Sequence, residues 1–407
     1  MQELIASYKV LPKVAKLFLI TQFFQSLYFS WPIFYGFATQ TITPLQVGLY
    51  FSIYSIVKLV AEVPTGAFSD KYGRKASALI GAIISGLVPV VMYFGHTLEA
   101  YMACAVLLAL GLAFTSGSLD SLVYDDKDIS KETYRKVAWL EITLYQIGLI
   151  TSAALGGLLY QLHPILPFIS EAMAWGVSFC LILVITERNK SPSKNKEKYL
   201  SYFGTGIRHL LATNYLKMVV MVGVVMAVII TACIEFVNEA SMISYGLEPY
   251  QRGLLIAAVK IIGLLVVNLA LMKILRGDKA RMIFVCFVGV VAFLLLGTGY
   301  LPVFLMGFIL FNWVSGTQFS FFKTVIHEHL PNSHRSTAIS GFSAVTGLVA
   351  FGAYAFFGWL IEVFKSPLIV YRFCACILLL MVPCVVWIVK QHDKLPAVVE
   401  DNEDKGV

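Results

Sequence analysis

The chain has 407 residues, of which 58% are hydrophobic and only 14% are charged, and its mean hydropathy is +0.78. One aqueous core cannot hide that much apolar surface, so the composition excludes an ordinary soluble globule and indicates an integral membrane protein. Apolar runs of about 20 residues recur along the chain, which is the length of a membrane-spanning helix and unlike the short alternating segments of a membrane β-barrel. The sequence therefore predicts an all-α polytopic membrane protein.

The elements predicted in chain order are twelve transmembrane helices. The first hydrophobic run follows Lys9, Lys13 and Lys16 and continues to Phe37 without a small-residue cleavage pattern, so we interpret it as a membrane helix and not as a signal peptide. The predicted spans cover residues 12–37, 44–68, 76–95, 98–124, 136–161, 165–186, 212–243, 250–275, 280–298, 302–327, 336–362 and 367–390.

The longest polar interruption divides the chain into two halves. We predict an N-terminal six-helix half at 1–187, a cytoplasmic central loop at 188–209, a C-terminal six-helix half at 210–390 and a disordered cytoplasmic tail at 391–407. Two six-helix halves are expected of parallel pseudo-repeats around a central cavity. We interpret the central loop as a solvated linker, with a regulatory site as the alternative.

Basic residues predict the orientation of the spans. Lysine and arginine gather in the loops on one side of the twelve-span arrangement, whereas the other side carries only Arg252, Lys365 and Arg372 near helix ends. The positive-inside rule then places both termini in the cytoplasm. The net charge of +7 reflects this bias and requires no nucleic-acid partner.

The sequence contains no recognisable catalytic or metal-binding motif. The seven cysteines lie in apolar stretches without metal-ligand spacing and are expected to fill space between helices. The stretch "HEHLPNSH", with His327, His329 and His334, lies at a helix end, and we interpret its zinc-like spacing as coincidental. No Ser/His/Asp set and no phosphate-binding glycine loop occurs. We therefore predict neither an enzyme nor a primary pump, and no cofactor or metal.

The most specific motif is "GAFSDKYGRK" between the second and third spans, which we call the charged loop. Its pattern is Gly66-x-x-x-Asp70-x-x-Gly73-Arg74-Lys75. The glycines permit close helix approach and a tight turn, and Asp70 can lie against the N-terminus of a neighbouring helix. Arg74 offers five donors to carboxylates on another helix.

The fourth span supplies the predicted partner of Arg74. In "SGSLDSLVYDD", Asp120 lies near the inner end of the span and Asp125 at its mouth, about one turn away. Either carboxylate could reach Arg74, and we favour Asp120 as the desolvated partner.

The charged loop resembles the loop motif of the major facilitator superfamily. Its place between the second and third spans, the twelve spans and the central loop also match that family, so the resemblance covers essentially the whole chain. It implies two six-helix halves and a loop that fastens the inner ends of the halves when a transporter faces outward. A static ion pair that fixes the fold is the alternative role for Arg74 and its partner.

Two departures from the antiporter motif of that family's drug exporters weaken a multidrug antiporter interpretation without removing it. The fifth span contains Gly156 and Gly157 without the proline that the antiporter motif places there, and the fourth span lacks an embedded arginine. The combination of "EVPTG", from Glu62 to Gly66, with "SGSLDSLVYD" resembles a bacterial branch whose substrates are mostly unassigned.

Ionisable residues inside predicted spans indicate possible proton coupling, because they are costly in a membrane and usually face a cavity. The proton-coupling candidates are Glu62, Lys58, Glu235, Lys260 and Glu141, and Glu171, Glu239 and Lys323 also lie in predicted spans. Glu62 is the first choice because it lies beside the charged loop and precedes Pro64, which can bend the helix. The alternative is a satisfied ion pair, Glu62 with Lys58 or Glu235 with Lys260.

Polar side chains among aromatic residues predict the lining of a substrate cavity. Gln22, Gln25 and Ser26 share one face of the first span, and the tenth span offers a similar set. The cavity candidates are Gln22, Gln25, Tyr28, Trp31, Gln146, Asn312, Trp313 and Gln318. Such walls suit an amphipathic or aromatic substrate, with lipid contact or packing as the alternative role of the aromatic residues.

These features predict a secondary active transporter of the bacterial inner membrane, multi-pass and monomeric, which exports a small organic solute by alternating access coupled to protons. A proton-coupled importer of a metabolite or siderophore is the first alternative, and a non-transporting receptor or lipid flippase on the same scaffold is the second. The expected partners are the small-molecule substrate, protons as the coupling ion and the lipid bilayer.

Overall fold

The computed structural model describes residues 8, 11–124, 126, 129–187, 208, 210–266, 278–328 and 335–392. Within these ranges the regular structure is helical and no strand occurs, which confirms the all-α fold class. The helices fall into two compact units. Unit 1 comprises Met1–Lys196 with Gly246–Ala258, and unit 2 comprises Glu197–Tyr245 with Val259–Val407.

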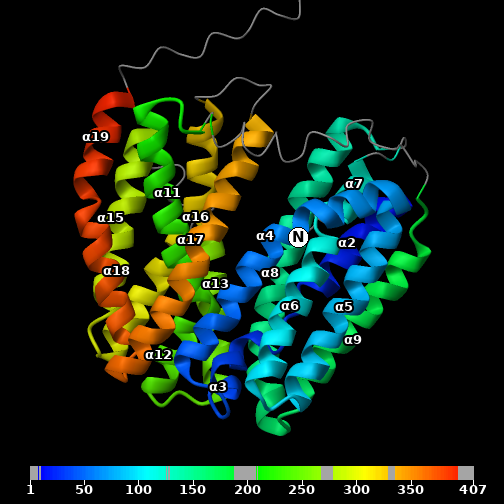
Figure 1. The fold of residues 1–407 in the computed structure, drawn as a ribbon, viewed down its shortest axis with the longest axis horizontal. Helices are drawn as coiled ribbons and strands as arrows, with labels where there is room; N and C mark the ends of the chain where they lie inside the picture. The colour runs from blue at the N-terminus through cyan, green and yellow to red at the C-terminus, as the bar shows by residue number, and fades with distance from the viewer. Residues whose placement is uncertain are drawn as a thin grey trace, which may run out of the picture. The chain divides into compact units, whose positions relative to one another are not determined.

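Unit 1 is a bundle of helices that run lengthwise beside one another (Figure 1). Its elements are α2 (Lys13–Gln25), η1 (Trp31–Ile33), α3 (Phe34–Ala38), α4 (Pro44–Tyr72), α5 (Arg74–Phe94), α6 (Leu98–Thr115), α7 (Ser118–Tyr124), α8 (Lys131–Leu162) and α9 (Leu166–Val184). Hydroxyl side chains fix several helix starts: Thr43 forms a capping box with Gln46 before α4, and Ser130 accepts from the backbone N–H of Thr133 in α8.

Small residues hold α4, α5 and α6 close together. A Cβ atom added at Gly81 of α5 would lie 2.7 Å from the carbonyl oxygen of Gly111 on α6, so only glycine fits this contact. The Thr65 hydroxyl of α4 donates to the carbonyl oxygen of Ala113 on α6, at 3.2 Å. Close backbone approach with interhelical hydrogen bonds is the packing that stabilises helices in a bilayer, where burial from water supplies no driving force.

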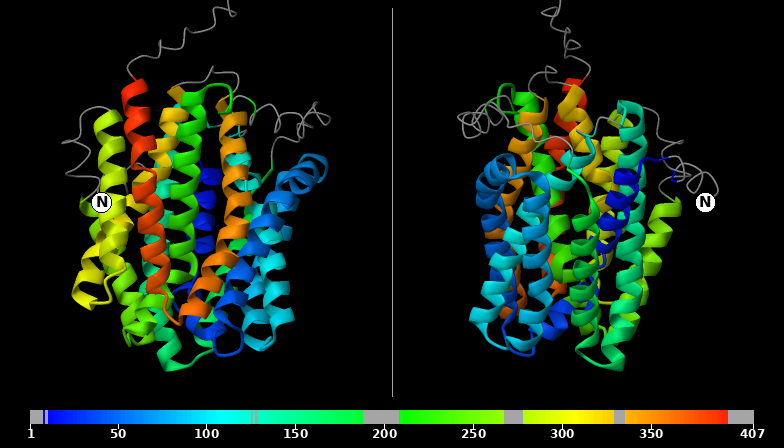
Figure 2. Two further views of the ribbon diagram at one scale, coloured as in Figure 1. Left: turned by 60° about the vertical axis from the view of Figure 1, so that its left-hand side comes forward. Right: turned by 90° about the vertical axis from the view of Figure 1, so that its right-hand side faces the viewer.

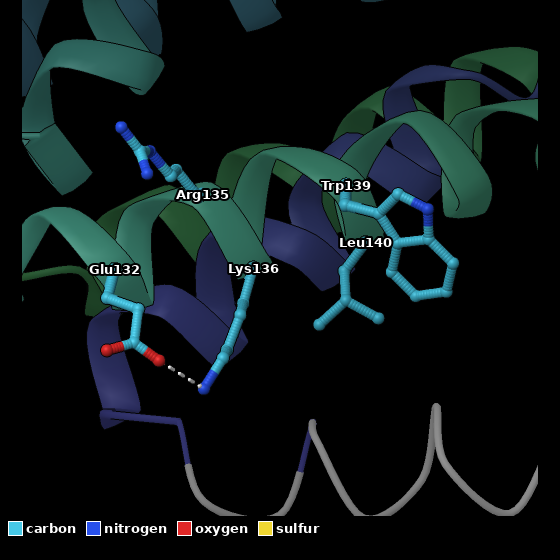
Figure 3. A pocket seen from close by; sticks show the side chains of 5 residues that line it. All are labelled: Glu132, Arg135, Lys136, Trp139 and Leu140. Atoms are coloured by element: carbon cyan, nitrogen blue, oxygen red, sulfur yellow. Dashed lines mark ion pairs between the residues drawn. The ribbon is translucent and has the colours of Figure 1, made fainter.

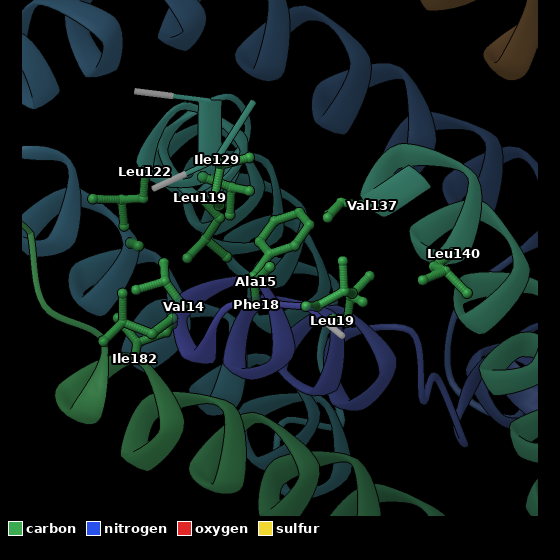
Figure 4. Close-up of a cluster of buried hydrophobic side chains, with 14 of the residues drawn as sticks. Val14, Ala15, Phe18, Leu19, Leu119, Leu122, Ile129, Val137, Leu140 and Ile182 are labelled. Carbon is green, nitrogen blue, oxygen red and sulfur yellow. The ribbon is translucent and has the colours of Figure 1, made fainter. Parts of the chain in front are cut away.

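Apolar side chains of α2, α5, α7, α8 and α9 form one buried cluster at the end of unit 1 that carries the charged loop (Figure 4). Its members include Val14, Phe18, Leu19, Leu119, Leu122, Val137, Leu140 and Ile182. This cluster fixes α7 and the first turns of α8 against α2. The polar residues described below are held in place by this packing.

The first predicted span, 12–37, is wrong as a continuous helix. The helix α2 ends at Gln25, and residues 26–30 separate it from η1. In this break the backbone N–H and the hydroxyl of Ser30 donate to Oε2 of Glu171 on α9, at 2.9 and 2.7 Å. Pro32 lies just after the break, and a proline disfavours helix in the residues that precede it.

Unit 2 is built from α11 (Asn214–Ala232), the π-helical turn η2 (Cys233–Val237), α12 (Asn238–Ser244), α13 (Pro249–Val266), α15 (Asp278–Leu296), α16 (Leu301–Glu328), α17 (Arg335–Phe364), α18 (Leu368–Leu380) and α19 (Val382–His392). These helices also run lengthwise (Figure 2). The start of α13, up to Ala258, packs with unit 1.

Each of the twelve predicted spans overlaps a helix in the described ranges, and nine helical stretches there are long and apolar enough to cross a membrane. Two further spans contain interruptions that the sequence analysis did not predict. The fourth is divided into α6 and α7 at residues 116 and 117, where Gly117 has φ +72°, and the twelfth is divided at Met381, two residues before Pro383.

Candidate functional site

Most of the charged loop is helical, and within it only Gly73 lies between two helices. The helix α4 ends at Tyr72 and α5 begins at Arg74, and Gly73 between them has φ +103° and ψ 150°. This backbone conformation is essentially restricted to glycine. The tight turn of the motif therefore falls at Gly73.

Glu187, which the sequence analysis missed, holds this turn. Its carboxylate follows α9 and accepts from the backbone N–H groups of Arg74 and Lys75, at 2.8 and 3.4 Å. In return, the Lys75 ammonium donates to the carbonyl oxygen of Leu183, in the last turn of α9, at 2.6 Å. A negative group thus caps the N-terminus of α5 and a positive group the C-terminus of α9, which matches both helix dipoles.

The predicted ion pair between Arg74 and Asp120 is absent, although the structure describes both residues. Nη1 of Arg74 instead donates to the carbonyl oxygen of Ser121, at 2.7 Å. The reason is that Ser121 lies in the last four residues of α7, whose carbonyl groups have no partner inside the helix. The other predicted partner, Asp125, lies outside the described residues.

The remaining motif positions behave differently from the prediction. A Cβ atom added at Gly66 would meet nothing within 4 Å, so this glycine does not permit a close helix approach. Asp70 is half-buried and forms no hydrogen bond or ion pair with a described residue. Beside the loop, the buried hydroxyl of Ser118 contacts those of Ser69 and Ser77, at 3.3 and 3.1 Å, and links α7 to α4 and α5.

Asp120 and Glu141 share one amide donor. Nε2 of Gln22 lies 2.7 Å from Oε1 of Glu141 and 3.5 Å from Oδ1 of Asp120. Gln22 comes from α2, Asp120 from α7 and Glu141 from α8, and all three side chains are half-buried. Neither carboxylate forms an ion pair with a described residue. We call Asp120 and Glu141 the carboxylate pair.

The other polar side chains predicted for the first span have packing partners. The amide of Gln25 is buried and donates to Oγ of Ser178 on α9, at 2.9 Å, so it ties α2 to α9. Tyr28 and Trp31 are half-buried at and after the break. Gln146, also predicted for the cavity, is half-buried on α8. Among the first-span residues, Gln22 makes hydrogen-bond contacts with two other candidate residues, Asp120 and Glu141.

Glu62 and Lys58 do not neutralise each other. Glu62 is exposed, and the Lys58 ammonium lies 5.8 Å from the centre of the Tyr54 ring, one turn back along α4. A cation at this distance from an aromatic face is attracted by the ring. The ion pair that was the alternative role for Glu62 is therefore not formed between these two residues, and Lys58 makes a cation–π contact.

The candidates in unit 2 occupy three different helices. Glu235 lies in η2 and Lys260 on α13, both half-buried. The Asn312 amide donates to the carbonyl oxygen of Phe308 in its own helix, at 3.0 Å. Gln318 is buried, and the buried Nε1 of Trp313 has no hydrogen-bond partner among the described residues.

The glycine pair of α8 serves close packing. A Cβ atom at Gly156 would overlap the carbonyl oxygen of Phe29 in the first-span break, and one at Gly157 would overlap the carbonyl oxygen of Pro249. Earlier in α8, a Cβ atom at Gly148 would overlap the hydroxyl of Ser26. Small residues on α8 therefore accommodate the broken first span.

Comparison with known proteins identifies the family. The family model described as Major Facilitator Superfamily matches residues 17–296, more than half of the chain. The chain belongs to the Major Facilitator Superfamily. The resemblance based on the charged loop is thereby confirmed.

Relatives in the Major Facilitator Superfamily match shorter regions. The chain is similar to Multidrug resistance protein 1 of Bacillus subtilis (strain 168), with 24% identity over 170 residues and 42% of each chain covered. It is 33% identical over 128 residues to the uncharacterized MFS-type transporter YxaM of the same strain, which covers 31% of each chain. The tetracycline resistance protein, class H, of Pasteurella multocida is 26% identical over 148 residues, 36% of each chain. The chain thus spans 31–42% of the length of these relatives.

Solved structures of transporters share the fold over nearly the whole chain. The nucleoside transporter NupG aligns with a TM-score of 0.78 and 15% identity over 93% of this chain and 100% of its own. A D-xylose-proton symporter aligns with a TM-score of 0.70 and 15% identity over 92% of this chain and 95% of its own. At these identities the likeness shows the fold alone.

Proposed function

We propose that the protein is a secondary active transporter of the bacterial inner membrane, which exports a small organic solute by alternating access in exchange for protons. Membership of the Major Facilitator Superfamily supports transport as the activity. The observation that carries proton coupling is the carboxylate pair, in which Asp120 and Glu141 approach one amide nitrogen of Gln22.

Two acidic groups in one membrane-embedded cluster suit proton binding. Charged side chains are costly within a membrane, and two negative charges near one neutral donor repel each other. A proton on either carboxylate removes that repulsion and turns a hydrogen-bond acceptor into a donor. We therefore place the exchangeable proton on the pair, and on Glu141 in particular, because its contact with Gln22 is the shorter one.

Gln22 offers a route from proton binding to movement. It lies on α2, four residues before the break at 26–30. When a proton binds Asp120 or Glu141, the hydrogen bond to Gln22 changes, and α2 can shift relative to the rest of the first span at that break. A proton that binds one arrangement of α2 better than another shifts the population toward that arrangement. Glu62, the first choice from sequence, is exposed and contacts neither Gln22 nor the carboxylate pair, which favours Glu141 over it.

Export is the direction we propose. Two of the relatives are named as a multidrug and a tetracycline resistance protein, which favours an outward direction and an organic solute for this chain as well. Import of a metabolite or siderophore is the second candidate. We propose that both termini lie in the cytoplasm, as the distribution of lysine and arginine predicts.

A metabolite comparison tests direction and activity together. Cells that lack the gene are compared with the parent strain by untargeted mass spectrometry of the cell interior and the medium, before and after an ionophore collapses the proton gradient. We expect a solute to accumulate inside the deletion strain, and the ionophore to produce the same accumulation in the parent. Depletion of a solute in the deletion strain would instead indicate import, and unchanged profiles would contradict transport.

A further inference from the structure

A pocket of about 300 Å³ opens at the start of α8 (Figure 3). Its lining residues are Glu132, Arg135, Lys136, Trp139 and Leu140. The pocket belongs to the end of unit 1 that carries the charged loop. There, the ring centroids of Tyr134 on α8 and Tyr124 on α7 lie 5.1 Å apart. Arg74 donates a hydrogen bond to the carbonyl oxygen of Ser121, also on α7.

Positive charge in the pocket is only weakly neutralised. Figure 3 shows Lys136 turned toward Glu132, and their Nζ and Oε1 atoms lie 3.0 Å apart. Their side chains are 59% and 80% exposed, and an ion pair so open to solvent contributes little stability. Arg135 is exposed and has no hydrogen bond or ion pair within the part of the chain that the structure describes.

An exposed apolar stripe continues from the pocket along α8. Trp139 is 58% exposed, and Ile142, three residues on, is 64% exposed, followed by the exposed Tyr145. The helix is one of the candidate membrane spans, and tryptophan is enriched where such spans meet the membrane surface. The pocket therefore offers cations at one end and a lipid-compatible surface at the other.

We propose that this pocket binds the headgroup of an anionic phospholipid, with Arg135 and Lys136 supplying charge for the phosphate and Trp139 lying against the acyl chains. Basic pockets beside membrane helices bind such headgroups, and arginine matches the geometry of phosphate oxygens. A soluble phosphate would use the two cations but would gain nothing from Trp139 and the stripe below it. The proposal does not depend on the solute carried or on proton coupling.

Glu132 is expected to weaken lipid binding at this pocket. Its carboxylate holds Lys136 at 3.0 Å and repels an incoming phosphate, so it competes with the lipid for the same ammonium group. Removing that charge frees Lys136. Glu132→Gln is therefore expected to increase binding of an anionic lipid.

The test measures retained lipid on the purified full chain by native mass spectrometry. Detergent micelles are mixed with phosphatidylglycerol, with phosphatidylcholine, or with phosphatidylglycerol and excess inorganic phosphate. We expect phosphatidylglycerol to be retained in preference to phosphatidylcholine, at least a fivefold loss in the double variant Arg135→Gln with Lys136→Gln, a loss in Trp139→Ala and a gain in Glu132→Gln. Lys217→Gln, at an exposed lysine on α11 of unit 2, is the matched control and should leave retention unchanged.

Three results would overturn the proposal. The first is unchanged retention in the double variant together with no gain in Glu132→Gln. The second is an equal loss in Lys217→Gln, which would reduce the effect to general surface charge. The third is displacement of phosphatidylglycerol by inorganic phosphate with no effect of Trp139→Ala, which would make the pocket a site for soluble anions. All four positions on α8 are exposed, so the variants should fold, and thermal unfolding of each one checks this.

Discussion

Individual residues of the charged loop differ in what they contribute, although all belong to one motif. Gly73 is required by its backbone conformation, whereas Gly66 faces open space. Glu187, and not Asp120, is the carboxylate that contacts the charged loop. It accepts hydrogen bonds from the backbone N–H groups of Arg74 and Lys75 and not from the Arg74 guanidinium. The motif thus fixes a turn whose acidic partner follows α9.

The two glycines provide a matched pair of substitutions. Gly73→Ala places a side chain at φ +103° and brings its Cβ to 2.9 Å from Oε2 of Glu187, so we expect a loss of about 1–3 kcal/mol in unfolding free energy. Gly66→Ala meets no atom within 4 Å and should be neutral or stabilising by about 1 kcal/mol, because alanine favours a helix interior. Thermal unfolding of both variants in detergent decides the matter, and equal effects would contradict the assigned geometry.

Glu187 allows a second prediction at this scale. Glu187→Ala leaves the first N–H groups of α5 without their acceptor and should lower stability by about 1–2 kcal/mol, as the loss of a helix cap does. Glu187→Gln keeps an oxygen acceptor and should recover part of that loss. The control is Glu132→Ala, an exposed acidic residue in the first turn of α8, for which we expect less than half the effect. A control that is equally damaging would argue against a specific cap.

At the scale of elements, the first span is the informative case. The sequence predicts one helix over 12–37, yet α2 stops at Gln25, because side chains from two other helices satisfy and accommodate the broken backbone. Glu171 of α9 is 6% exposed and accepts both donors of Ser30, while Gly156 of α8 leaves room for the carbonyl group of Phe29. Hydropathy cannot reveal such partners, because they lie more than 100 residues away.

The break can be tested through its acceptor. Glu171→Ala leaves the buried N–H of Ser30 without a partner, which should lower the unfolding free energy by about 1–3 kcal/mol. Glu171→Gln retains an oxygen acceptor and should be milder. Ser30→Ala removes only the hydroxyl and serves as the control with a smaller loss. Thermal unfolding measures all three, and a Glu171→Ala variant as stable as the parent would show that the break does not depend on this side chain.

Features that depend on neighbouring residues could be predicted from the sequence, whereas contacts between distant helices could not. Local signals were sufficient for the existence of each span, the short turn at Gly73 and the family, but not for the breaks within the first, fourth and twelfth spans. Several contacts were not predicted: Arg74 donates to a backbone carbonyl of α7, the Lys58 ammonium lies over an aromatic ring, and Gln22 joins residues of two other helices. A single sequence does not encode which helices pack together, so Glu141 was one candidate among several.

For the whole molecule, the central claim is that proton binding at the carboxylate pair drives transport. A proton carrier should be needed for movement against a gradient but not for exchange of solute across the membrane, since exchange needs no net proton transfer. Glu141→Gln removes the titratable group and retains a polar side chain beside Gln22. Glu62→Gln is the matched control, an exposed carboxylate on α4.

The most direct measurement follows the solute found by the metabolite comparison in proteoliposomes that contain the full chain. Proton-driven accumulation and solute exchange are recorded for the parent, Glu141→Gln and Glu62→Gln. The account predicts that Glu141→Gln loses proton-driven accumulation by at least tenfold while exchange persists, and that Glu62→Gln keeps both. Proton-driven accumulation that survives Glu141→Gln, or that is lost in Glu62→Gln alone, would contradict it.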